Sequence, residues 1–182
     1  LHQVDVGTAG NGSARGTINT VYDPSIMDLE YPNVRVISNF GNAQGQVNVS
    51  NTAAGDVHLT DVVASNAGTV TISAASGNIE NMNPASLITA DNIVLNATNG
   101  AIGSAGSPIL TDLQNGSLTA SALNDIVVTE TAGTMLVGTV TSAGGNVDLT
   151  ASTGGITLGT INATSGNVTL VADGMIGETT NT

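Results

Sequence analysis

Apolar and polar residues alternate in a short phrase that occurs three times between residues 124 and 178. The phrase reads NDIVVTET, then GNVDLTAS, then GNVTLVAD, and its first aliphatic residues, Ile126, Val147 and Val168, are 21 residues apart. In each copy the aliphatic residues are two positions apart, so they lie on one face of a β-strand. A fixed period of this length indicates that the chain stacks one supersecondary unit on itself, because a single unit cannot bury its apolar face alone.

The same pattern, followed in both directions, predicts three series of short strands. The first series opens at Val47, Val70, Ile93, Ile126, Val147 and Val168, with steps of 23, 23, 33, 21 and 21 residues. The second opens at Val34, Val57, Ile79 and Ile102, and continues near Met135, Ile156 and Ile176; the third opens at Ile88, Ile109, Val140 and Ile161. We therefore predict an all-β fold, a right-handed parallel β-helix (β-solenoid) with three short strands in each coil of about 21–23 residues.

The irregular steps predict how the chain is divided. Residues 45–182 are expected to form the β-helix repeats, and the single long step places an insertion near 111–121 (TDLQNGSLTAS), which we expect to leave the coil as a loop or short hairpin. Residues 1–44 are expected to be an irregular N-terminal coil or cap, with 22–31 as a cover or an inserted loop. The last coil lacks a cap, so we expect either further coils or pairing with another chain there.

A row of polar residues precedes the strands of the first series. These residues are Gln46, Thr69, Asn92, Asp125, Asn146 and Asn167. Asparagine tolerates the backbone angles of corners, and stacked amides can form hydrogen bonds from coil to coil. We predict a structural ladder that includes Asn92, Asp125, Asn146 and Asn167; the functional alternative is a row of amides that binds a ligand.

The composition of the chain excludes some classes of binding partner and some kinds of site. The chain of 182 residues has 23 glycines, 2% aromatic and 9% charged residues, no cysteine, and 14 acidic against 2 basic residues, for a net charge of −12. Such a chain repels nucleic acid and anionic membranes, and we expect it to bind neither. Without cysteine it forms no disulfide and no thiolate metal site. We recognise no signal peptide or transmembrane run, and expect a mature or excised portion of a longer protein.

The residues offer little for catalysis. A glycosidase needs converging carboxylates, whereas the acids here are dispersed along the chain, so we predict no catalytic residue and no enzyme. The two histidines, His2 and His58, are not spaced for zinc. Arg35, His58 and Glu80 each follow an opener of the second series, and we interpret them as a surface ion pair rather than a site.

No cofactor is expected, and calcium is the one metal that the acidic composition leaves open. The glycine-aspartate nonapeptide of calcium-binding β-rolls is missing from the sequence, and the candidate ligands are Asp56 and Asp61. Threonine-rich segments such as GTVTS raise ice binding as another alternative, but valine and aspartate interrupt the outward-facing threonine positions.

Three segments, GAIGSAGSPILT (100–111), NDIVVTETAG (124–133) and VGTVTSAGGNVDLTAS (137–152), resemble repeats of filamentous haemagglutinin-like bacterial surface adhesins. The resemblance covers about residues 47–177. It implies a long right-handed parallel β-helix at the bacterial cell surface or outside the cell, acting as a rigid stalk or fibre subunit. The expected partners are further copies or further coils, end to end, with a cell surface or carbohydrate ligand left open. The alternative function is a carbohydrate-binding or carbohydrate-cleaving β-helix.

Overall fold

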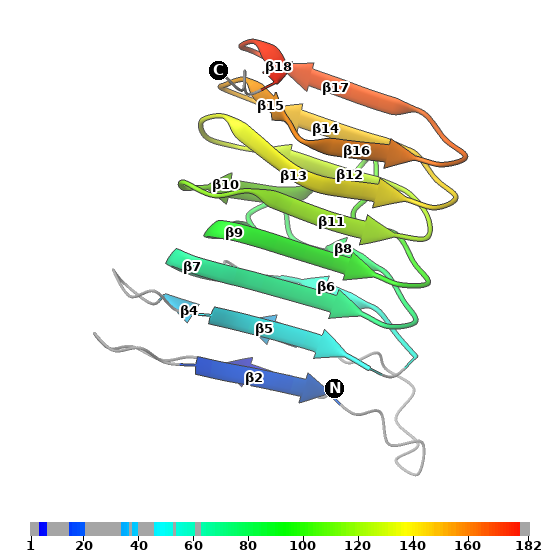
Figure 1. Cartoon of the computed structure of the whole chain (residues 1–182). Coiled ribbons are helices and arrows are strands. Elements are labelled where there is room, and N and C mark those ends of the chain that lie inside the picture. Colours follow the sequence, from blue (N-terminus) through cyan, green and yellow to red (C-terminus); the bar gives the residue numbers. More distant parts are fainter. Residues whose placement is uncertain are drawn as a thin grey trace.

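A computed structural model describes residues 4–6, 15–20, 34–36, 38–39, 46–52, 54–60 and 63–178, with the backbone alone for the strands before residue 46 and for residues 64–67. These residues form a β-solenoid of about six turns, in which parallel strands of successive turns lie one above the other (Figure 1). The described part of the chain contains strands and no helix, and hence no helix that is long and apolar enough to span a membrane. The predicted all-β parallel solenoid is confirmed.

The strands of successive coils pair in rows that run along the stack. The front row of Figure 1 contains β2 (Arg15–Thr20), β5 (Gln46–Asn51), β7 (Val63–Ala74), β9 (Ile88–Ala97), β11 (Leu118–Ala122), β13 (Met135–Ser142) and β16 (Thr160–Ala163). A second row contains β4 (Ser38–Asn39), the first residues of β7 and β9, then β10 (Ile109–Leu113), β12 (Ile126–Glu130), β14 (Val147–Ala151) and β17 (Val168–Ala172). The remaining pairs are β1 (Val4–Val6) with β3 (Val34–Val36), β6 (Val57–Leu59) with β8 (Ile79–Asn81), and β15 (Ile156–Leu158) with β18 (Ile176–Glu178) and the start of β13. Bridges through Ile102 continue the row of β6 and β8 to the start of β12.

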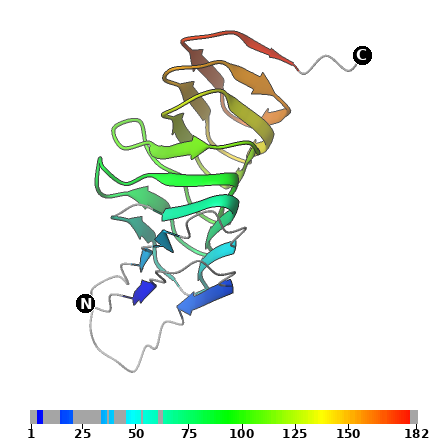
Figure 2. The ribbon, with the colours of Figure 1, turned by 90° about the vertical axis from the view of Figure 1, so that its left-hand side faces the viewer.

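One aliphatic core runs along the axis of the stack. Strands such as β12 and β14 alternate buried and half-buried residues, as the sequence pattern predicts for strands with one face inward. Ile79, Ile102 and Ile126 are fully buried and stack directly on one another, since parallel bridges join Ile79 to Ile102 and Ile102 to Ile126. Each such side chain contributes about 1.5–3 kcal/mol by leaving water. Figure 2 shows the stack after a quarter turn, with the coils one above the other.

The register differs from the prediction in the middle of the chain. Ile93 pairs with Leu118 and not with Ile126, while Ile126 pairs with Ile102 and, in the next coil, with Val147. The predicted first series therefore joins two rows: its first three openers lie in the front row and its last three in the second. The error arises because aliphatic openers occur in every row, so a constant step alone does not identify which row a strand belongs to.

The predicted insertion at 111–121 is wrong for the same reason. Thr111 lies in β10, where it pairs with Ile88 on one side and Glu130 on the other. Residues 118–121 lie in β11, between β9 and β13. No loop leaves the coil between them other than the four-residue turn 114–117. The paired residues Ile93 and Leu118 are 25 residues apart, so this coil is only slightly longer than its neighbours.

Glycines stack where coils come closest at one corner. A Cβ added to Gly100 would overlap the carbonyl group of Gly77, and a Cβ on Gly77 would overlap that of Gly55. Glycine is required there because the backbones of successive coils approach each other too closely for any side chain. The glycines at this corner thus have a steric cause.

The two ends of the described stack differ from its middle. At the N-terminal end β2 pairs in register with β5, so the parallel ladder already includes part of the region 1–44, while the expected cap at 22–31 lies outside the described residues. At the other end Val168, Val171, Met175 and Ile176 are 44–87% exposed. They are exposed because no further coil among the described residues covers them.

Candidate functional site

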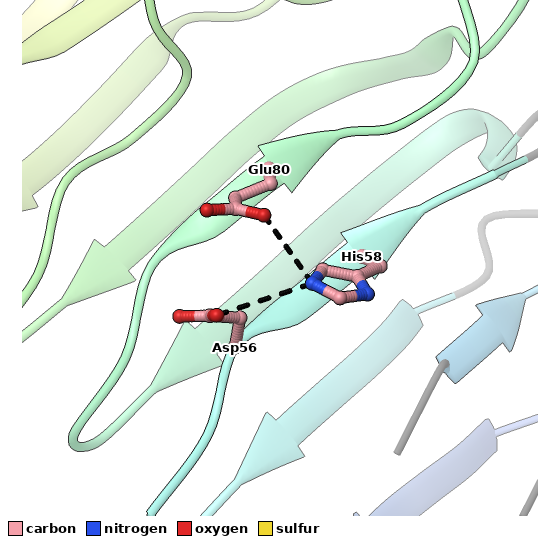
Figure 3. Close-up of side chains that lie close together, drawn as sticks. All are labelled: Asp56, His58 and Glu80. Atoms are coloured by element: carbon pink, nitrogen blue, oxygen red, sulfur yellow. Dashed lines mark ion pairs between the residues drawn. The ribbon is translucent and has the colours of Figure 1, made fainter. Parts of the chain in front are cut away.

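Two adjacent coils place one histidine and two carboxylates side by side on the outer surface. Val57 pairs with Ile79, and the same register sets His58 of β6 beside Glu80 of β8 (Figure 3). His58 Nε2 lies 3.3 Å from Glu80 Oε2 and 4.0 Å from Asp56 Oδ2. All three side chains are partly buried, and each offers a ligand atom within 4.8 Å of the other two. Both carboxylates thus face the same ring nitrogen.

Asn78 holds both carboxylates from the opposite side. Its backbone N–H donates a 2.7 Å hydrogen bond to Asp56 Oδ1, and its side-chain Nδ2 donates a 3.1 Å hydrogen bond to Glu80 Oε1. The side-chain oxygen of Asn78 accepts a 2.9 Å bond from the backbone N–H of Ala101 in the following coil, which fixes the amide orientation. The other oxygens, Asp56 Oδ2 and Glu80 Oε2, are the ones directed at His58.

The structure brings together only part of what the sequence suggested. The proximity of His58 and Glu80 agrees with the predicted ion pair, whereas the side chain of Arg35 lies outside the described residues. Of the two candidate calcium ligands, Asp56 belongs to the cluster and Asp61 lies outside the described residues. The 22-residue step from Val57 to Ile79 pairs His58 with Glu80, but it does not bring in Asp56, which precedes the strand.

A ladder of side-chain oxygens does connect the coils, but its row differs from the predicted one. Asp125 Oδ1 accepts a 2.7 Å bond from the Asn146 backbone N–H, and Asn146 Oδ1 accepts a 2.9 Å bond from the Asn167 N–H. Upstream, the same row continues at Asp56 and Asn78, not at Asn92. Asn92 lies in the front row, where its Oδ1 accepts a 3.1 Å bond from the Ser117 N–H. These contacts join successive coils and therefore support coil stacking.

Glu130 is a buried carboxylate that the sequence did not single out. It is 0% exposed, and its oxygens accept hydrogen bonds from Thr111 Oγ1 at 2.6 Å and from the Leu113 N–H at 2.9 Å. β12 ends at Glu130 while β10 continues to Leu113, so the carboxylate replaces a backbone acceptor that the next coil does not supply. Glu130 therefore completes the hydrogen bonding of the ladder locally.

Removal from water raises the pKa of the Glu130 carboxyl, and the hydrogen bonds from Thr111 and Leu113 offset part of that effect. Because the folded pKa exceeds the unfolded one, the folded state keeps a proton that the unfolded state has already released. The free energy of unfolding therefore decreases as the pH rises from the unfolded pKa through the folded pKa, and this contribution is constant above that window.

A hollow of about 340 Å³ borders the cluster on the side of the following coil. It is lined by Asn78, Glu80, Asn81, Met82, Ala101, Gly103, Ser104 and Ser107. Its walls are backbone, small polar side chains and one methionine, and none of its lining residues is aromatic or basic. Tyr22, Tyr31 and Phe40, the three aromatic residues of the chain, lie outside the described residues. Among the described lining residues, none provides an aromatic surface on which a sugar ring could stack.

Comparisons with protein-family models, with curated proteins and with solved structures give no match for this chain. Any statement about its function consequently depends on the solenoid, the surface cluster and the sequence pattern.

Proposed function

We propose that the chain is a non-catalytic structural segment, a rigid β-helical stalk or fibre subunit of an extracellular or bacterial surface adhesin. The observation that carries this proposal is the continuous parallel ladder, in which every coil from β2 to β18 is hydrogen-bonded to the next over a single aliphatic core. Such a stack has contacts only between neighbouring coils, so its length grows with the number of coils while its cross-section stays constant. This is the geometry of a spacer.

The similarity of residues 100–111, 124–133 and 137–152 to filamentous haemagglutinin-like repeats supports the same proposal. The acidic charge, the lack of cysteine and the small polar residues of the corners suit a surface that is solvated along its whole length. The hollow beside the surface cluster has no aromatic side chain among its described lining residues, which favours a mechanical role over sugar binding.

Single-molecule force spectroscopy tests the mechanical role. The chain would be placed between two reference domains and stretched, and we expect stepwise extension in units of one or a few coils, because each coil is held by its neighbour. Val147→Asp, which places a charge in the core, serves as the control and should lower the unfolding force of the coils around it. Extension without any resolvable force would refute the role of a rigid stalk. Specific binding or cleavage on a glycan array would instead favour the alternative function.

Association end to end is the proposed mode of partnership. The apolar side chains exposed on the last coil, including Val168 and Ile176, are the surface on which a further coil or another copy would stack. Electron microscopy and sedimentation over a range of concentrations, with and without a chelator, test this proposal. We expect filaments one coil-stack wide that are lost in Ile176→Asp. Monomeric rods at every concentration would show that the isolated segment does not assemble by itself.

A further inference from the structure

We propose that Asp56, His58 and Glu80 form a binding site for one divalent transition-metal ion of the Zn²⁺ class, which joins two successive coils. Asp56 and His58 belong to the coil of β6, and Glu80 belongs to β8 in the next coil. An ion bound to all three would link side chains that are 22–24 positions apart in the sequence but neighbours in the ladder. This site is independent of the proposed stalk function.

The distances fit such an ion after a small adjustment. Zinc bonds of about 2.0–2.2 Å in a tetrahedral arrangement place neighbouring ligand atoms about 3.4 Å apart. His58 Nε2 and Glu80 Oε2 are already separated by 3.3 Å. His58 Nε2 and Asp56 Oδ2 are separated by 4.0 Å, and the ligand atoms of all three residues lie within 4.8 Å of one another, so the Asp56 side chain must approach its partners for one ion to contact all three.

The surroundings prepare the carboxylates for this role. Asn78 occupies one oxygen of Asp56 and one oxygen of Glu80, and leaves the second oxygen of each directed at His58 Nε2. Outer contacts of this kind orient metal ligands and reduce the ordering that binding requires. Two carboxylates facing one imidazole also carry more negative than positive charge, even when His58 is protonated. A divalent cation neutralises this excess.

The donor set selects the class of metal. Calcium and magnesium take oxygen ligands almost exclusively, whereas a histidine nitrogen with two carboxylates suits zinc and its neighbours in the first transition row. The three side chains are only partly buried, so solvent water can complete the coordination. The site therefore differs from the calcium site with Asp56 and Asp61 that the sequence suggested.

Calorimetric titration of the full chain with Zn²⁺ alone tests the proposal, with Ca²⁺ as the comparison ion. His58→Gln and Glu80→Gln each remove one ligand while keeping a polar side chain on the outer face, so both variants should fold as the wild type does. Asp148→Asn is the matched control, because it removes one outward carboxylate from a distant coil. Asp56 is not substituted, since its carboxylate accepts a hydrogen bond from the Asn78 backbone N–H, whereas a glutamine oxygen at position 80 can still accept the bond from Asn78 Nδ2.

We expect one Zn²⁺ per chain, bound more tightly than Ca²⁺, with affinity reduced roughly tenfold or more in His58→Gln and Glu80→Gln and unchanged in Asp148→Asn. Co²⁺ should give visible absorption bands from a nitrogen and oxygen ligand set in the wild type, and these bands should be lost in His58→Gln. The proposal is overturned if Zn²⁺ binds the three variants and the wild type equally, or if binding is weak, without fixed stoichiometry and equal for Ca²⁺. Circular dichroism of each variant establishes that it is folded.

Discussion

Ile102→Ala measures how much the aliphatic row along the axis stabilises the stack. Ile102 is 0% exposed and is bridged to Ile79 below and Ile126 above, so truncation removes contacts with both neighbouring coils. Three carbon groups lost at about 0.8 kcal/mol each give roughly 2.4 kcal/mol of transfer free energy. Hydrogen bonds on both sides, from the Ile102 N–H to Asp125 O and from the Gly103 N–H to Ile79 O, hinder collapse of the void. A cavity contribution then brings the expected loss to about 3–5 kcal/mol.

Urea unfolding followed by circular dichroism, together with hydrogen exchange of the neighbouring coils, provides the assay. The matched variant is Ile176→Ala, the same chemical change at a residue that is 44% exposed in the last coil, where it leaves an open surface instead of a void. We expect that variant to lose roughly 1 kcal/mol. Similar losses for Ile102→Ala and Ile176→Ala would refute the inference that Ile102 is packed between two coils.

Three further predictions concern the core, the buried carboxylate and the corners. Val147→Asp should unfold at least the local coils, since it buries a charge. Thr169→Asp lies on the exposed face but beside Asp148 in the ladder, so it should cost no more than about 1 kcal/mol, from repulsion between the two carboxylates. Thermal melts that are equal for both variants would contradict the alternation. The free energy of unfolding of the wild type should decrease as the pH rises above about 4.3, the usual pKa of a glutamate, and Glu130→Gln should abolish the part of this decrease that Glu130 causes. If the urea midpoints of the wild type and the variant change with pH in parallel, burial does not raise this pKa. Gly154→Ala should cost about 1–3 kcal/mol because the new Cβ overlaps the carbonyl of the preceding coil's glycine, while Gly106→Ala, which faces open space, should be silent in the same melt.

The fold could be predicted because its main determinant is local. Alternating aliphatic residues fix which side of each strand faces the core, and the three copies at Ile126, Val147 and Val168 repeat with an unchanged step. The row to which a strand belongs could not be predicted in the same way. In β7 and β9 the second row runs straight into the front row, whereas from β10 onward a turn separates them, and this change shifts the apparent period without adding a loop.

The candidate site was only partly predictable because it depends on contacts between coils. His58 and Glu80 could be paired from the 22-residue step of their strands, and the structure agrees. Asp56 could not be added, because it lies at a corner, where its side-chain direction follows from the hydrogen bond to Asn78 and not from strand alternation. Glu130 was missed because its burial depends on the relative ends of two paired strands: Glu130, the last residue of β12, pairs with Thr111, and β10 continues for two more residues.

The ladder of side-chain oxygens explains why aspartate and asparagine exchange freely in one row. The backbone N–H of the next coil needs only an acceptor oxygen, so either residue type suffices at these corners, and the row is interrupted only at Ala101, between Asn78 and Asp125. Consecutive aspartates would place like charges about 4.8 Å apart, the spacing between strands, and would repel each other. Asn78 follows Asp56, and Asn146 and Asn167 follow Asp125, so the row never contains two adjacent carboxylates. The one place on these coils where two carboxylates do face each other across His58 is the proposed metal site, and there a bound cation removes the same repulsion.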